Sequence, residues 1–344
     1  MSQPAGWAPP PPPRENNGLK FLLIGIAFLL VIAISVGATL LLTRNGTTGQ
    51  RSADQPPSAT ADVASANDSG PVGIITEDPT CKPARAVFDT LTAQQRKGWI
   101  DRDISIPAAS WTPEQRTMYQ SVGDAMLRAS EQLVNLSKLT THRVMRELYL
   151  QSIVYWRAYE KSISSYVKED NFLALTASNA ANAVVSICTT IEYDVAATRS
   201  ATVAPPAAPS SIAPIEDAND SARFVTHTDY SICQEWKTAS DRFDSETEDW
   251  RDSDVGIPAS DWGPEQRSMM ERVAISMRTH AQDVETLGRK SGNPIFEDIA
   301  TLSAQYWRAF VDAIPTYTTA DSYFSATGAH ADFTIFNACA AIDR

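Results

Sequence analysis

The sequence is poor in the residues that most often perform catalysis or bind metals. Histidine and cysteine occur four times each in 344 residues. The histidines are scattered outside any HExxH pattern, and the cysteines have neither CxxC nor zinc-ligand spacing. GxSxG, P-loop and Rossmann glycine patterns are also absent. We therefore expect a protein that is not an enzyme and that uses no cofactor or metal, with a hydrolase built on paired carboxylates as the least favoured alternative.

Positive charge is scarce as well. The chain has 29 Lys and Arg against 41 Asp and Glu, a formal net charge of -12. The deficit is concentrated, because residues 81–195 carry 13 basic against 12 acidic residues, whereas residues 226–344 carry 10 against 20. An acidic surface repels phosphate backbones, so we expect no nucleic-acid partner.

The acidic run of residues 241–261 invites comparison with calcium-binding loops. It does not follow the EF-hand pattern, because Gly256 and Gly263 stand where a ligand and the bidentate Glu are needed. We interpret the run as a solvated acidic face, and the sequence leaves open whether that face binds cations.

Long hydrophobic runs are limited to one. Phe21 to Leu42 is uncharged over 22 residues, and a helix of that length reaches about 33 Å, enough for a hydrocarbon core of about 30 Å. A signal peptide has a shorter apolar region that ends at a small-residue cleavage site. The pattern therefore predicts one transmembrane helix over residues 21–43.

The cysteines indicate which side of the membrane the folded region occupies. Basic residues flank both ends of the predicted span, so the positive-inside rule barely discriminates. All four cysteines follow the span, and paired cysteines favour an oxidising compartment. We expect a single-pass plasma-membrane protein with a cytoplasmic N-terminus and extracytoplasmic C-terminal domains.

Three segments have the composition of disordered chain or linkers. Residues 1–20 contain five consecutive prolines, Pro9 to Pro13, and form a Pro-rich cytoplasmic head that is a candidate contact for a cytoplasmic partner. Residues 44–80 have the composition of a Ser/Ala/Pro-rich stalk. Residues 196–225 form a Pro/Ala/Ser linker between two similar regions.

Those two regions are copies of one another. With an offset of 151, residues 99–119 match residues 250–270 at 12 of 21 positions, and the correspondence extends to Cys188 and Cys339. The duplication predicts a helical repeat domain 1 over residues 81–195 and an acidic helical repeat domain 2 over residues 226–344.

Each copy has helical periodicity. In the first copy, Thr112, Pro113 and Gln115 have the pattern of a capping residue, a first-turn proline and a capping-box amide. Apolar residues follow at helical spacing in both copies, with little strand signal. The predicted fold class is all-α: two tandem disulfide-linked helical bundle domains, of about four helices each, after the transmembrane helix.

The four cysteines permit three pairings. The duplication favours Cys81 with Cys188 and Cys233 with Cys339, because this pairing treats both copies alike. Each bond then joins the start of a repeat to its last helix. Buried free thiols are the alternative.

Two repeated phrases contain the candidate binding residues. The first includes Trp111 and Trp262; the second includes Trp156, Arg157, Trp307 and Arg308. We favour a structural interpretation, in which the tryptophans pack in the core and the Arg residues pair with Glu114 and Glu265 or stack on a ring. The alternative is an aromatic and Arg pocket for a carboxylate, a sugar or a lipid head.

The architecture resembles the uncharacterised membrane-anchored envelope proteins of mycobacteria and related actinobacteria. The features that carry this resemblance are Pro9 to Pro13, the span at Phe21 to Leu42 and the Ala/Pro/Ser linkers. The resemblance implies a cell-envelope location. It concerns layout and composition, and it assigns no role to any residue of the repeats.

The leading functional hypothesis is a non-enzymatic, membrane-anchored binding or interaction protein of the cell envelope. Its duplicated domains would contact an extracytoplasmic protein or a cell-wall component. The alternative is an extracytoplasmic sensor or ligand receptor that uses the aromatic and Arg pocket.

Overall fold

The computed structural model describes residues 63–342, which are helical and contain no strand. The first repeat contains α2 (Cys81–Gln95), α3 (Pro113–Leu139), α4 (Arg143–Ser162) and α5 (Asn171–Glu192). The second contains α7 (Tyr230–Glu246), α9 (Pro264–Ser291), α10 (Pro294–Ala313) and α11 (Ser322–Ala340). The short helices are α6 (Val195–Arg199) and α8 (Glu248–Arg251). The prediction of an all-helical fold is confirmed, with four main helices per repeat among these residues.

Short 3-10 helices connect the longer ones. They are η1 (Ala108–Ser110), η2 (Ile163–Ser165), η3 (Lys168–Asp170), η4 (Ser200–Thr202), η5 (His227–Asp229), η6 (Ala259–Asp261), η7 (Ile314–Thr316) and η8 (Thr319–Asp321).

The start of the longest helix in each repeat follows from local sequence. At α3, the Thr112 hydroxyl accepts from the Gln115 amide at 3.2 Å, while Gln115 Oε1 accepts from the Thr112 amide at 2.9 Å. This is the predicted capping box. At α9, Gly263 replaces the threonine and offers no side-chain cap, so only the first-turn Pro264 remains.

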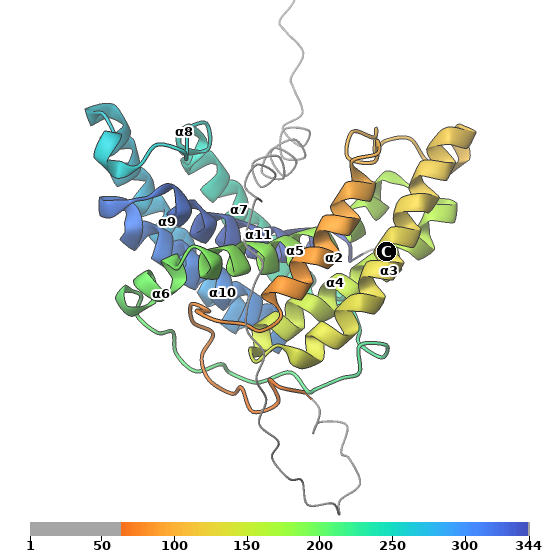
Figure 1. Ribbon diagram of the computed structural model, residues 1–344, viewed down its shortest axis with the longest axis horizontal. Helices are drawn as coiled ribbons and strands as arrows, with labels where there is room; N and C mark the ends of the chain where they lie inside the picture. Colours follow the sequence, from red (N-terminus) through yellow and green to blue (C-terminus); the bar gives the residue numbers. More distant parts are fainter. Residues whose placement is uncertain (1–62, 343–344) are drawn as a thin grey trace, which may run out of the picture. The chain divides into compact units, whose positions relative to one another are not determined.

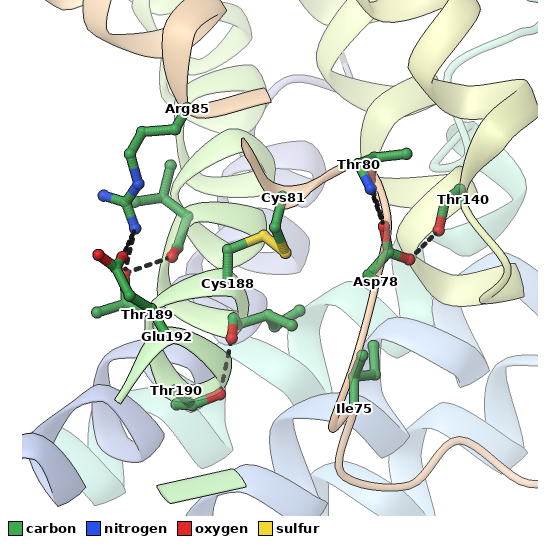
Figure 2. Close-up of a disulfide and its surroundings, with 12 residues drawn as sticks. Ile75, Asp78, Thr80, Cys81, Arg85, Thr140, Cys188, Thr189, Thr190 and Glu192 are labelled. Carbon is green, nitrogen blue, oxygen red and sulfur yellow. Dashed lines mark hydrogen bonds and ion pairs between the residues drawn. A yellow bond between two sulfur atoms is a disulfide. The ribbon is translucent and has the colours of Figure 1, made fainter. Parts of the chain in front are cut away.

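Both repeats are closed by a disulfide. Cys81 at the start of α2 is bonded to Cys188 in α5, and Cys233 in α7 is bonded to Cys339 in α11. These are the two bonds that the duplication predicts. Figure 2 shows that the first bond lies beside a second link between the same helices, in which Arg85 pairs with Glu192 at 2.8 Å.

The two repeats pack against each other through equivalent helices. The most extensive contact is between α5 and α11, which cross the centre of the folded region (Figure 1), and α4 also contacts α10. Residues at the same position in each repeat contact one another. The side chain of Asn179 lies against that of its equivalent, His330, and the side chain of Glu147 hydrogen-bonds to that of its equivalent, Asp298. A residue meets its own equivalent at an approximate twofold axis, so the repeats are arranged like the subunits of an isologous dimer.

The described residues cluster as one unit, and the division into two separate tandem domains is not confirmed. The buried core is correspondingly continuous from one repeat to the other. We therefore use the word repeat for the two copies from here on.

Residues 63–80, the first leader, differ from the predicted stalk. Val63, Val72 and Ile75 are buried, and the Ile75 amide donates to the hydroxyl of Tyr306 in the second repeat at 3.3 Å. The Thr80 hydroxyl lies 2.8 Å from the Tyr149 hydroxyl in the first repeat. Composition suggested solvated chain because the few apolar residues are separated by small and polar ones, yet those few are the ones that pack.

Residues 203–226, the second leader, likewise pack onto the helices. Gln151 in the first repeat donates to the Ala222 carbonyl and accepts from the Phe224 amide, both at 3.2 Å. Asn293 in the second repeat donates to the Phe224 carbonyl at 2.6 Å. Each leader therefore bonds to both repeats, and the predicted linker is part of the folded unit.

The sequence predicts a transmembrane helix over residues 21–43, and these lie outside the residues that the structure describes. Within residues 63–342, one helical stretch, Lys168–Glu192, is long and apolar enough to cross a membrane. It is mostly buried inside the fold and includes Cys188, which is bonded to Cys81. These contacts are those of a core helix.

Candidate functional site

The first repeated phrase forms the same set of bonds in both repeats. The indole of Trp111 donates to the Ile106 carbonyl at 2.9 Å, and that of Trp262 donates to the Ile257 carbonyl at 2.8 Å. Both rings are largely buried and stack on a tyrosine of their own repeat. Each repeat thus supplies both a carbonyl acceptor for the indole N–H and an apolar surface for the ring of its own tryptophan.

An Arg and a Tyr complete each copy of this structure. Arg116 donates to the Ala108 carbonyl and Arg267 donates to the Ala259 carbonyl, both at 2.9 Å. The corresponding tyrosine hydroxyls also donate to the loop, Tyr166 to the carbonyl of residue 104 and Tyr317 to the carbonyl of residue 255. The phrase occurs twice because each repeat needs this connection to enter its longest helix.

The tryptophans of the second phrase lie in the two cores. Trp156 and Trp307 are each about 1% exposed. Trp156 packs edge-on against Phe88, and Trp307 packs edge-on against Phe243 and Trp250. Protein atoms cover the aromatic faces that the proposed pocket needs.

The neighbouring Arg residues have structural partners. Arg157 donates to the Ala218 carbonyl in the second leader at 3.2 Å, and Arg308 forms an ion pair with Glu285 in α9. The suggested pairing with Glu114 and Glu265 is wrong, because Arg157 is bonded to the second leader and Arg308 to Glu285 instead. The structure does not bring the six candidate residues together, and the ligand-receptor alternative stays a prediction without a pocket built from them.

The second repeat has a buried polar network that the first repeat lacks. Asp332 accepts from the Ser303 hydroxyl at 2.6 Å and from the Trp307 indole at 2.8 Å, and it lies 2.8 Å from His280 Nε2. The carboxylate stands between the serine and the histidine, so the histidine is not placed to take a proton from the serine, as a catalytic triad requires. We interpret the network as part of the core.

The acidic run of the second repeat is held by local bonds. Asp241 pairs with Lys237 at 2.6 Å, Asp244 pairs with Arg251 at 2.8 Å, and Asp254 accepts from the Gly256 amide at 2.8 Å. Across the part of the chain that the structure describes, no group of three acidic, His or Cys side chains is arranged to hold a metal ion.

A surface recess of about 370 Å³ lies between α3 and the end of α4 in the first repeat. Its lining mixes both charges with polar groups and a single apolar side chain: Arg116, Gln120, Asp124, Glu160, Lys161, Ile163 and Ser164. The recess is open, and none of the six candidate binding residues lines it.

The most unusual group of side chains lies near the twofold axis, where α4 meets α10 and the first leader. We call it the axial charge cluster, and it consists of Asp68, Arg143, Arg146, Glu147 and Asp298. Arg143 is 1% exposed and bonds to both carboxylate oxygens of Asp298, at 2.6 and 2.9 Å. A bidentate pair of this kind fixes the two helices in a defined register.

The same cluster holds the first leader. Arg143 donates to the Asp68 carbonyl at 2.6 Å, and Arg146 donates to the Ser65 hydroxyl at 2.8 Å. The Asp68 carboxylate accepts from the Arg143 amide at 2.6 Å. The first leader is therefore bonded to the residues at which the two repeats meet.

Glu147 is the exception within the cluster. It is 1% exposed, and neither of its carboxylate oxygens accepts a hydrogen bond from a donor in residues 63–342. Burial, reinforced by the charge of Asp298, raises the pKa of Glu147 well above its ordinary value. The sequence gives no sign of this cluster, because charged residues at these spacings are typical of a solvated helix face.

Fold and bonding together define an internally duplicated, disulfide-linked helical protein whose two repeats pack about an approximate twofold axis. The family model for mycobacterial ESX-1 associated proteins matches residues 63–343, and the chain belongs to that family. The match begins at the first leader and spans both repeats, so the family unit includes all the described elements.

The chain is also similar to a second mycobacterial protein. An uncharacterised protein of Mycolicibacterium smegmatis (strain MKD8) is 41% identical over 325 residues, which covers 93% of this chain and 85% of the relative. No solved structure matches the chain significantly. The resemblance to mycobacterial proteins is confirmed, whereas the membrane anchor that it implied is not.

Proposed function

We propose that this chain is a membrane-anchored, extracytoplasmic interaction protein that works with the mycobacterial ESX-1 secretion system through a protein partner and catalyses no reaction. Membership of a family described as ESX-1 associated is the observation that carries the proposal. The apolar run of residues 21–42 supports the anchor.

The disulfides support the proposed location. Each repeat is closed by one bond, and no cysteine is left free. Disulfides of this kind persist in oxidising compartments and are rare in the cytosol of mesophiles. We therefore assign the folded region to the outer side of the plasma membrane.

The two repeats differ in surface charge, and this difference supports a role in binding a partner. Near the end of α7, the exposed residues Glu246, Glu248 and Asp249 align with Gln94, Arg96 and Lys97 of the first repeat, at the offset of 152 that matches Cys81 with Cys233. The duplicated phrase next to them keeps the same bonds in both copies. Two copies that keep one fold while their surfaces diverge are suited to two different contacts.

Crosslinking in intact mycobacterial cells tests the proposal. The full chain is compared with a shortened chain that ends at residue 80 and retains only the predicted head, anchor and stalk. We expect a component of the ESX-1 system to be recovered with the full chain and not with the shortened one. Equal recovery with both chains, or recovery of no such component, would contradict the proposal.

A charge exchange localises the contact. The variant Glu246→Gln/Glu248→Arg/Asp249→Lys gives the second repeat the residues of the first. Loss of the crosslinked component, with the fold retained, places the partner at this end of the second repeat. The reciprocal change Gln94→Glu/Arg96→Glu/Lys97→Asp is the matched control for the first repeat.

A further inference from the structure

We propose that Glu147 carries a proton that keeps α4 and α10 packed together, and that release of this proton loosens the contact between the two repeats. The titrating group lies in the axial charge cluster, at the point where the repeats and the first leader meet. The inference follows from the fold and does not depend on the proposed function.

The charges of the axial charge cluster balance only when Glu147 is protonated. Arg143 and Arg146 supply two positive charges, and Asp68 and Asp298 supply two negative charges. The cluster is neutral when Glu147 is protonated and has an excess negative charge when it is ionised. An unpaired charge in a buried site is costly, and the site either binds a proton or admits water.

The hydrogen bonds around Glu147 also favour its protonated form. The carboxyl of Glu147 hydrogen-bonds to the Asp298 carboxylate, and this bond requires a proton on Glu147. Arg143 is bonded to Asp298 and Arg146 is directed to Ser65, so neither Arg donates a hydrogen bond to Glu147. A buried carboxylate is normally stabilised by such bonds, and their absence around Glu147 within the described residues favours the neutral acid.

The elements around Glu147 contribute one other buried carboxyl group among the described residues, that of Glu297 on α10. In α5 the charged residue is Glu192, at the far end, where it pairs with Arg85. The charged side chains of α3 lie on its exposed side or, for Lys138, pair with Asp217 of the second leader at 3.8 Å. On α10, Glu297 accepts from Ser210 of the second leader at 3.0 Å.

The direction of the pH effect follows from the raised pKa. A carboxyl group whose pKa is higher in the packed state stabilises that state most below its ordinary pKa, and this contribution is lost as pH rises through the raised value. Between those two pH values, separation of α4 from α10 releases one proton. The opening equilibrium constant then rises about tenfold per pH unit.

Hydrogen exchange on the full chain, purified in detergent, measures this opening. We compare the wild type with Glu147→Gln, which has the same shape and cannot ionise, and correct exchange in α4 and α10 for its intrinsic pH dependence. We expect the ratio of protection in the wild type to that in the variant to fall about tenfold per pH unit over the stated window. Contributions of other titrating groups, including the buried His330, cancel in this ratio.

Exposed Glu131 on α3 provides the control variant, Glu131→Gln, which is expected to follow the wild type. A direct titration of the Glu147 carboxyl by carbon NMR in the wild type keeps the test independent of any variant. A pKa near the ordinary value for Glu overturns the proposal. A ratio of protection that does not change with pH also overturns it.

Discussion

His330 Nδ1 lies 3.0 Å from Asn179 Oδ1, and the two residues occupy the same position in the two repeats. One side of the axis therefore has a titratable ring where the other has an amide. Burial lowers the pKa of His330 to about 4.

This pair leads to a prediction about acid stability. His330 is neutral in the folded protein but takes up a proton near pH 6.5 when unfolded, so its contribution to stability is lost as pH falls from about 6.5 towards about 4. The His330→Asn variant restores an Asn on both sides of the axis. We expect it to remove a loss of about 1.4 kcal/mol per pH unit over this interval.

Denaturant unfolding at a series of pH values measures the effect. An unchanged slope in His330→Asn would show that another group is responsible.

The fold was largely predictable because local signals and duplication both indicate it. Thr112, Pro113 and Gln115 give the start of α3 from sequence, and the duplication selects one cysteine pairing from three. These inferences need no knowledge of which helix contacts which.

The axial charge cluster was not predictable in the same way. Arg143, Arg146 and Glu147 have the spacing of a solvated face, and their burial depends on Asp298, which lies more than 150 residues away. The leaders were missed for a related reason, since their few apolar residues become buried only when both repeats are present.

Removal of one disulfide at a time tests the equivalence of the repeats. Cys81→Ser/Cys188→Ser opens a loop with a sequence separation of 107, and Cys233→Ser/Cys339→Ser opens one of 106. We expect each pair of substitutions to lower the free energy of unfolding by up to about 4 to 5 kcal/mol, because loops of this size differ little in closure entropy. Denaturant unfolding of both variants measures the losses, and a large difference between them would contradict equal roles.

The repeated phrase gives a matched pair of single substitutions. Arg116→Ala and Arg267→Ala each remove a bond of 2.9 Å to a buried loop carbonyl. We expect each to lower stability by about 1 to 2 kcal/mol, since a charge-assisted hydrogen bond is lost at a partly exposed site. The exposed Arg128→Ala in α3 should have little effect. A loss in one repeat only would show that the phrase has a role beyond the fold.

The buried network of the second repeat depends on Asp332. Asp332 accepts from Ser303 and Trp307 and lies beside His280, so Asp332→Ala leaves three buried polar groups without this partner. The first repeat has Ala181 at the same position, so the backbone tolerates alanine there. We expect a loss of several kcal/mol, because each buried polar group left without a partner costs about 1 to 3 kcal/mol.

Adding His280→Ala to Asp332→Ala should recover part of that loss. The double variant has the Ala129 and Ala181 pair of the first repeat and no longer buries an unpaired imidazole. A double-mutant cycle with denaturant unfolding measures the coupling, and Asp312→Ala, which removes a partly exposed ion pair with Arg278, is the control. Additive losses would mean that His280 and Asp332 stabilise the core independently, and the core of the second repeat would then tolerate either residue without the other.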